Sequence, residues 1–210
     1  MGHLLVLRHA QSVWNAAGRW QGWTDAPLSP LGAEQARKAG RALASLGTSP
    51  DRVASSDLAR ARQTAELLAA ELGYEGPFVV DPDLREQELG QWNGLTREEI
   101  EARWPGQIEA RGAGRLDRVP GGETRRAFFE RAMGALGRLG AGGDDVLAVT
   151  HGGVVMALER ALGIWHEGNR HGNLSGWRLE AKGSPPNLDL VPLEHLDLLA
   201  MGAETVTGSA

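Results

Sequence analysis

The sequence predicts an α/β fold of three layers (α/β/α), in which a mostly parallel central sheet is flanked by helices. Short apolar runs alternate along the chain with longer stretches of helical periodicity, an order typical of βαβ units. Several of these runs are followed directly by a histidine, an arginine or an acid. Ligands of open α/β sheets bind outside the carboxyl ends of the strands, so these side chains are expected to converge there.

The strands are predicted from runs that are short and rich in Leu or β-branched residues. They lie at 3–7, 51–54, 78–80 and 145–150, and two weaker candidates follow at 175–180 and 187–191. The stretches between them predict helices at 30–46, 57–72, 95–104, 123–139 and 153–163. In the first helix, apolar residues from Leu31 to Leu46 share one face. The Gly- and Arg-rich segment 106–118, between two prolines, is interpreted as a loop or short lid.

Length and composition point to one soluble domain. At 210 residues, a single domain is expected over 1–201, with a flexible tail over 202–210. The 22 basic and 27 acidic residues are mixed along the chain, which argues against a surface for nucleic acid or anionic membranes. The absence of cysteine excludes disulfides, thiolate metal sites and a cysteine nucleophile. No signal peptide or membrane span is visible, so we expect a cytoplasmic protein.

The first strand ends in the pair Arg8-His9. Arginine offers a planar fork of donors that suits phosphate oxygens, and an imidazole beside it can attack phosphorus or donate a proton. The pair therefore indicates phosphoryl chemistry. Taken alone, it is explained equally well by a surface arginine and a strand-end histidine with its hydrogen bonds satisfied.

Two further strands end in a similar way. After the second strand, Ser56 or Asp57 is predicted to cap a helix, which places Arg60 in the first turn, able to point back to the strand ends. Arg62 lies about 200° round the helix from it and is expected to face solvent or an acid. After the fourth strand, His151 precedes two glycines that open a helix, whose free N–H groups favour an anion.

Two acids follow the third strand. Glu86 is a candidate general acid and Glu88 an ordinary solvated residue, although their spacing alone does not decide which has which role.

Six short motifs of the chain resemble the histidine phosphatase superfamily, in its phosphoglycerate-mutase-like branch. They are Arg8-His9-x-Gln11-Ser12-x-x-Asn15, Gly22-x-x-Asp25-x-Pro27-Leu28-Ser29-x-x-Gly32, Ser56-x-Leu58-x-Arg60-Ala61-x-Gln63-Thr64, Leu84-Arg85-Glu86, Pro120-Gly121-Gly122-Glu123 and His151-Gly152-Gly153. They occur in the family's order between residue 4 and about residue 155. The chain departs from the common pattern at Ala10, where glycine is usual, and at Gln11, where glutamate is frequent.

The resemblance implies a phosphoglycerate-mutase-like fold and a nucleophile at His9 that forms a phosphohistidine. Glu86 would protonate the leaving oxygen, and no metal or other cofactor would be needed. The implied phosphate-binding residues are Arg8, Asn15, Gln21, Gly22, Arg60, His151 and Gly152. For attack, His9 must be neutral, with its other ring nitrogen held by an acceptor such as a nearby backbone carbonyl.

The resemblance also frames the alternatives. Mutases of this family carry a Tyr-Gly-x-Leu-x-Gly-Leu-Asn-Lys segment, and the matching stretch 89–97 lacks its Tyr and Lys, which favours a phosphatase. Its substrate would be a small phosphorylated metabolite, a sugar phosphate or a phosphoglycerate-type ester. An ester that carries a carboxylate is a further candidate, because the segment that follows contains Arg103, Arg111, Arg115 and Arg118. A cofactor-dependent phosphoglycerate mutase is the alternative, and a non-catalytic phosphate-binding protein is less favoured because no core residue is missing.

Other features of the sequence allow two interpretations. Trp14, Trp20 and Trp23 lie close to His9 in sequence and either wall the site or pack beneath the first loop. Stretch 172–179 is similar to that of actinobacterial-type sugar-phosphoglycerate phosphatases. A homodimer remains open.

A metal site is the remaining rival. His166, Glu167 and His171 are candidate ligands, but the chain has no HExxH motif, and all three are expected to be exposed loop residues.

Overall fold

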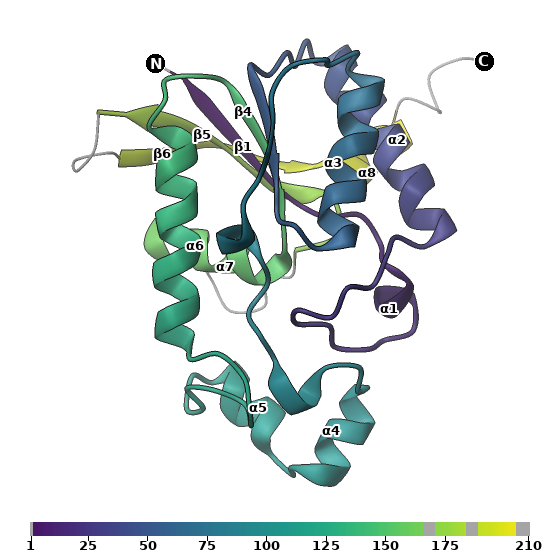
Figure 1. The fold of residues 1–210 in the computed structure, drawn as a ribbon, viewed down its shortest axis with the longest axis vertical. Helices are drawn as coiled ribbons and strands as arrows, with labels where there is room; N and C mark the ends of the chain where they lie inside the picture. The colour runs from purple at the N-terminus through teal and green to yellow at the C-terminus, as the bar shows by residue number, and fades with distance from the viewer. Residues whose placement is uncertain (1, 166–170, 184–188, 205–210) are drawn as a thin grey trace.

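The computed structural model describes residues 2–165, 171–183 and 189–204. Within these ranges, six strands form one sheet in the order β3-β2-β4-β1-β5-β6 (Figure 1). They are β1 (His3–Arg8), β2 (Arg52–Ser55), β3 (Phe78–Val80), β4 (Val146–Thr150), β5 (Ser175–Lys182) and β6 (Asp189–Asp197). The first four run parallel, and β5 and β6 pair antiparallel at one edge. The mostly parallel sheet is confirmed; residues 187 and 188 of the last predicted strand lie outside the described residues.

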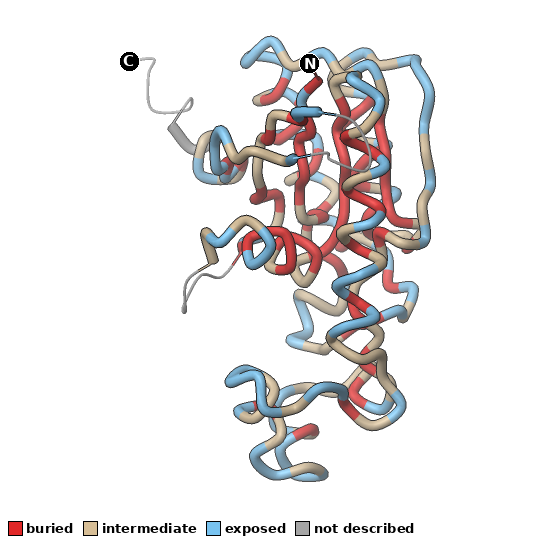
Figure 2. Tube along the Cα trace, turned by 90° about the vertical axis from the view of Figure 1, so that its left-hand side faces the viewer, coloured by how far each residue is buried: buried red, intermediate tan, exposed pale blue. Residues whose placement is uncertain are grey.

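Helices cover both faces of the sheet (Figure 1). On one face lie α6 (Arg125–Gly140) and α7 (Gly152–Ala161), and on the other α2 (Pro30–Ser45), α3 (Ala59–Glu71) and α8 (Leu198–Glu204). In β1, Leu4 and Val6 pack toward α6 and α7, whereas Leu5 and Leu7 pack toward α2 and α3. Figure 2 shows the resulting buried centre of the molecule. Because both faces are covered, β1 is an unbroken apolar run rather than an alternating one.

The predicted cap of the helix after β2 is wrong. Helix α3 begins at Ala59, and its N-cap is Leu58, whose side chain makes no capping hydrogen bond. Ser56 Oγ instead accepts from the N–H of Leu58 at 3.1 Å and lies 2.8 Å from His151 Nε2. The Asp57 carboxylate pairs with Arg85. Both predicted capping side chains therefore have partners elsewhere.

A small second cluster lies beyond the sheet, at the lower end of the molecule in Figure 1. It contains α4 (Arg97–Arg103) and α5 (Gln107–Gly112), and the predicted loop 106–118 is wrong where α5 occupies it. The apolar side chain of Ile108 is buried against Ile100 and Trp92, and this packing stabilises the short helix. Sequence patterns also did not indicate α1 (Val13–Ala16) or the 3-10 turns η1 (Pro82–Leu84) and η2 (Gly90–Trp92).

The last helix, α8, extends to Glu204, and residues 205–210 of the expected tail lie outside the described residues. Among the residues that the structure describes, no helix has both the length and the apolar character needed to cross a membrane.

Candidate active site

The carboxyl ends of the four parallel strands surround a pocket of about 360 Å³. It collects side chains that are far apart in sequence, since β1, β2, β3 and β4 all end on the same side. Eight of the nine predicted site residues line it, namely Arg8, His9, Asn15, Gln21, Gly22, Arg60, Glu86 and Gly152. The ninth, His151, does not line the pocket but lies in edge contact with the His9 ring, 5.1 Å away between ring centroids.

His9 is buried, at 3% exposure, and its backbone N–H donates to the carbonyl of Thr150 at 2.8 Å. Its Nδ1 lies 2.6 Å from the carbonyl oxygen of Ala10, which is the backbone acceptor that the sequence analysis required. With the proton on Nδ1, the lone pair of Nε2 is free to attack. Burial and the charges of Arg60 and Arg8 lower the pKa of His9 well below its ordinary value, so the ring is neutral at neutral pH.

Buried Arg60 and half-buried Arg8 bring positive charge to the strand ends of the pocket. Arg60, at 1% exposure, donates to the carbonyls of Gly22 and Thr24, both at 2.8 Å. Burial lowers the pKa of Arg60 to about 10, which leaves it charged at neutral pH. Arg8 donates to the carbonyl of His171. No ion pair among the described residues includes Arg8 or Arg60, and the Nε atom of each is buried without a hydrogen-bond partner. Buried donors of this kind favour an anionic ligand.

Gly22 fixes the loop that orients Arg60. Its φ is +48°, and a Cβ there would lie 2.3 Å from Asn93 Oδ1 and 2.8 Å from the amide nitrogen of Leu89. Only glycine fits this position, and its carbonyl is then aimed at Arg60. Arg62, by contrast, pairs with Glu66 on the exposed side of α3, as predicted.

His151 forms the floor behind His9. It is fully buried, and its Nε2 lies 2.8 Å from Ser56 Oγ, while Nδ1 has no partner in the part of the chain that the structure describes. Burial, followed by the charge of Arg60, lowers the pKa of His151 well below its ordinary value. Both histidines of the site are therefore neutral in the folded protein.

Glu86 is held at the N-terminus of α7. One carboxylate oxygen accepts from the N–H of Gly153 at 3.0 Å and the other from the N–H of Gln87 at 2.8 Å. A Cβ on Gly153 would lie only 2.0 Å from Glu86 Oε1, so the second glycine after His151 makes room for this carboxylate. The sequence pattern predicted that this glycine opens a helix, and the contact with Glu86 explains why the position has no side chain.

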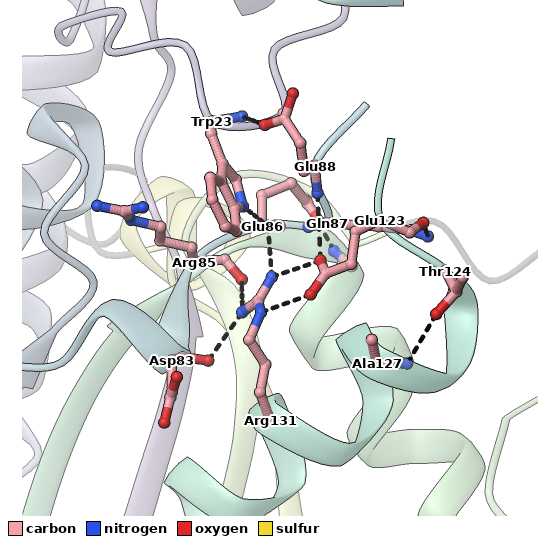
Figure 3. Close-up of polar contacts among 12 residues, drawn as sticks. Trp23, Asp83, Arg85, Glu86, Gln87, Glu88, Glu123, Thr124, Ala127 and Arg131 are labelled. Carbon is pink, nitrogen blue, oxygen red and sulfur yellow. Dashed lines mark hydrogen bonds and ion pairs between the residues drawn. The ribbon is translucent and has the colours of Figure 1, made fainter. Parts of the chain in front are cut away.

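Arg131, which the sequence analysis did not single out, positions the segment that carries Glu86 (Figure 3). From α6 it donates to the backbone carbonyls of Asp83, Arg85 and Glu86 at 2.8–2.9 Å. It also forms a two-pronged ion pair with Glu123, and the two side chains are 16% and 14% exposed.

Replacing Arg131 with methionine is expected to lower the free energy of unfolding by about 3–5 kcal/mol, because Glu123 would be left as a largely buried, unpaired charge. Denaturation in urea measures the change. The matched control is Arg126→Met on the same helix, where an 85%-exposed arginine pairs with Glu130 and the expected loss is much smaller, because solvent screens an exposed ion pair. Equal losses in the two variants would contradict this account of Arg131.

Glu88 is not the solvated residue that was expected. Its carboxylate accepts from the N–H of Trp23 and of Gly90, each at 2.9 Å, and from Asn93 Nδ2 at 2.5 Å. It therefore ties the loop after β1 to the loop after β3, as the contact with Trp23 in Figure 3 shows. Trp23 also donates from Nε1 to the carbonyl of Glu86 at 2.7 Å.

Of the three tryptophans near His9, only Trp20 lines the pocket. Its ring packs edge to face on that of Trp92, with centroids 5.4 Å apart. Trp14 instead packs against Gly94, where an added Cβ would lie 3.1 Å from the indole. Trp20 therefore forms part of the wall of the site, whereas Trp14 packs against a neighbouring loop.

The expectation for His171 is wrong, and His166 and Glu167 lie outside the described residues. His171 is buried, and its Nε2 lies 2.9 Å from Oε2 of Glu159, a residue with 0% exposure. Trp177 Nε1 donates to the other oxygen of Glu159 at 2.8 Å. A buried carboxylate such as that of Glu159 needs hydrogen-bond partners, and His171 is buried because it is one of them. Among the described residues, no group of three or more His, Asp or Glu side chains is arranged to hold a metal ion.

The segment that follows His171 also holds the end of β1 that carries His9. Asn173 Nδ2 donates to the carbonyl of His9 at 2.9 Å, and the N–H of Leu174 donates to that of Arg8 at 3.0 Å. Leu174 is fully buried and adopts a φ of +59°. This conformation is strained for a leucine, and the packing around the residue maintains it. Sequence patterns gave no sign of this role.

The two neutral histidines predict how stability depends on pH. Their pKa values are lower in the folded than in the unfolded protein, so the unfolded chain binds protons first as the pH falls. Their full contribution is present above the unfolded value of about 6.5 and is lost below it, by up to about 1.4 kcal/mol per histidine for each pH unit.

Urea unfolding between pH 7.5 and pH 5 measures this dependence. Between these pH values, the free energy of unfolding of His151→Asn is expected to fall less than that of the wild type. An unchanged slope would show that His151 is not held neutral by the fold.

Comparison with known proteins identifies several with a similar sequence and structure. The family model described as histidine phosphatase superfamily (branch 1) matches residues 4–190. Glucosyl-3-phosphoglycerate phosphatase of Mycolicibacterium vanbaalenii is 42% identical over 171 residues, which cover 76% of this chain and 73% of that protein. A 2,3-bisphosphoglycerate-dependent phosphoglycerate mutase of Methylobacterium radiotolerans is 37% identical, over 77% of this chain and 80% of the mutase. The solved structure of a mycobacterial glucosyl-3-phosphoglycerate phosphatase with VO3 aligns with a TM-score of 0.77 at 33% identity, over 91% of this chain and 97% of that one.

Proposed function

The chain belongs to the histidine phosphatase superfamily, and from this premise we propose that it hydrolyses a phosphate monoester through a phosphohistidine on His9. The enzyme is a phosphatase, and its reaction is proposed to need no metal ion. One observation carries the proposal: a neutral histidine, held at Nδ1 by the Ala10 carbonyl, shares the pocket with half-buried Arg8 and buried Arg60, and no described carboxylate forms an ion pair with either arginine.

In the first step, the lone pair of His9 Nε2 attacks phosphorus, and the N–P bond forms as the ester P–O bond breaks. Arg8 and Arg60 stabilise the charge on the phosphoryl oxygens, and Asn15 adds a hydrogen bond at the pocket wall. His151 packs against the His9 ring from behind and thereby supports its orientation. Glu86 gives its proton to the leaving oxygen, which departs as an alcohol.

In the second step, water takes the place of the alcohol. Glu86, now a carboxylate, accepts a proton from the water as its oxygen attacks phosphorus. The N–P bond breaks, its electron pair returns to His9 Nε2, and inorganic phosphate leaves. Glu86 and His9 are then in their starting states.

The proposed substrate is a small phosphorylated metabolite, a sugar phosphate or a phosphoglycerate-type ester. A relative that is 42% identical is named a glucosyl-3-phosphoglycerate phosphatase, which supports a sugar ester of phosphoglycerate. A mutase relative at 37% identity makes isomerisation the reaction to test beside hydrolysis.

A panel of phosphate monoesters, assayed with a chelator present, tests the proposal. Phosphate release that the chelator leaves unchanged is expected, with little isomerisation of 3-phosphoglycerate in parallel. Isomerisation without release would make the enzyme a mutase, and loss of activity with the chelator would contradict metal independence.

A further inference from the structure

A second cavity, of about 480 Å³, adjoins the active-site pocket. The two share Arg111, Gly153 and Met156 as lining residues, so they are direct neighbours. The second cavity lies where α5 meets the start of α6 and the length of α7, and we call it the arginine groove. It contributes nothing to the steps described above.

The arginine groove takes its name from Arg111, Arg125 and Arg160, which come from α5, α6 and α7 respectively. None of the three belongs to an ion pair of the described residues. Among the described residues, Arg111 and Arg125 donate to neutral acceptors: Arg111 donates to Gln87 Oε1 at 2.7 Å, and Arg125 donates to the Arg111 carbonyl at 3.2 Å.

The three guanidinium groups are close enough to act on one another. Burial lowers the pKa of Arg111, Glu86 opposes that shift, and the charges of Arg125 and Arg160 add to it. The charge of Arg125 also adds to the effect of burial in lowering the pKa of Arg160. The charge of Glu86 offsets part of the repulsion at Arg111, but no described carboxylate forms an ion pair with any of the three arginines. An anion between them would relieve the remaining repulsion.

A neutral donor and an apolar wall complete the arginine groove. Trp165 Nε1 is buried and has no hydrogen-bond partner among the described residues, and the Arg160 guanidinium lies 4.6 Å from the centre of the Trp165 ring. Phe128, Met156 and the exposed ring of Phe129 contribute apolar surface to the same cavity. The groove thus offers several donors beside an apolar surface, a combination that suits an acidic group carried on a carbon skeleton.

We propose that the arginine groove binds a second acidic group of the substrate, a carboxylate or phosphate on the leaving-group side of the ester that His9 attacks. The inference rests on the proposed function and selects between its substrate classes: phosphoglycerate-type esters, which carry a carboxylate, over simple sugar phosphates. Arg125, Arg160 and Trp165 are the residues that determine this specificity.

Two pairs of esters test the proposal, because the members of each pair differ only in the acidic group. 3-Phosphoglycerate is compared with glycerol 3-phosphate, and 6-phosphogluconate with sorbitol 6-phosphate, which places the carboxylate farther from the phosphate. In at least one pair, the wild type is expected to prefer the acid in kcat/KM. Arg125→Gln and Arg160→Gln should each lower kcat/KM for that acid by about 10- to 100-fold, the effect of losing a charged hydrogen bond, and should leave the alcohol within about threefold.

Two further variants sharpen the comparison. Trp165→Phe removes the indole N–H but keeps a ring, and should lower kcat/KM for the acid alone. Arg62→Gln, an exposed arginine on α3 that pairs with Glu66, is the matched loss of charge and should change neither substrate. No preference for the acid in either pair, or a preference that survives both arginine variants, would overturn the proposal.

A binding measurement distinguishes a failure of this inference from a failure of the proposed reaction. In the His9→Ala background, calorimetry with the same esters should show tighter binding of the acid, and Arg160→Gln should abolish the difference. This difference in binding would support the arginine groove even if the enzyme hydrolysed none of the esters. Hydrolysis of the esters without the difference in binding would contradict the proposal for the groove but not the proposed reaction. If citrate altered turnover of glycerol 3-phosphate while the acid preference was absent, the groove would bind a separate anion, contrary to the proposal.

Discussion

Replacement of His9 by alanine is expected to lower kcat for phosphate release on the order of 10⁴- to 10⁶-fold, since the proposed reaction has no other nucleophile. Arg8 and Arg60 would still bind the phosphate, so affinity for inorganic phosphate should change far less than turnover. Initial rates with the best ester of the panel measure the first effect, and calorimetry with inorganic phosphate the second.

His3→Ala is the matched control for this variant. His3 stands at the other end of β1, about half exposed and paired with Asp145, so its removal tests the loss of a strand-end histidine without touching the pocket. Full activity in His3→Ala beside inactive His9→Ala is expected. Activity that survived in His9→Ala would move the nucleophile to another residue.

Glu86→Gln is expected to show a loss that depends on the leaving group. An alkyl alkoxide needs a proton in order to depart, so kcat for glycerol 3-phosphate should fall about 10²- to 10⁴-fold. 4-Nitrophenolate departs without one, and the first turnover of 4-nitrophenyl phosphate should stay fast. Hydrolysis of the phosphoenzyme would then be slow, because the amide that replaces the carboxylate accepts no proton from water. Rapid mixing should therefore show a burst of about one nitrophenolate per enzyme, followed by slow turnover.

Glu88→Gln distinguishes the two acids that follow β3. Glu88 holds the N–H groups of Trp23 and Gly90 and does not line the pocket, so this variant should lose stability and show no burst. A burst in Glu88→Gln and none in Glu86→Gln would reverse the proposed roles.

The residues that could be predicted are those whose signal is local. Arg8, His9 and His151 each follow an apolar strand within one or two positions, and topology then brings strand ends together. The same logic placed Arg60 and Glu86 in the pocket. Element types were predictable for a similar reason, because the apolar runs of the parallel strands and the faces of the long helices are written in short windows of sequence.

The features that were missed depend on partners far away in the chain. Ser56 is a good capping residue by type, but its hydroxyl interacts with His151, 95 positions later. Arg131 and Glu159 look like ordinary helix charges. Only their contacts with the loop after β3 and with His171 and Trp177 show that Arg131 is largely covered and that Glu159 is buried. Neither periodicity nor capping preference contains this information.

Trapping the phosphoenzyme tests the central claim most directly. Enzyme mixed with substrate and quenched in alkali, where a phosphohistidine survives, would be digested and analysed by mass spectrometry. The account predicts phosphate on the peptide that contains His9, lost on exposure to acid and absent from His9→Ala. Phosphate on any other residue, or turnover in which no phosphoenzyme forms, would contradict it.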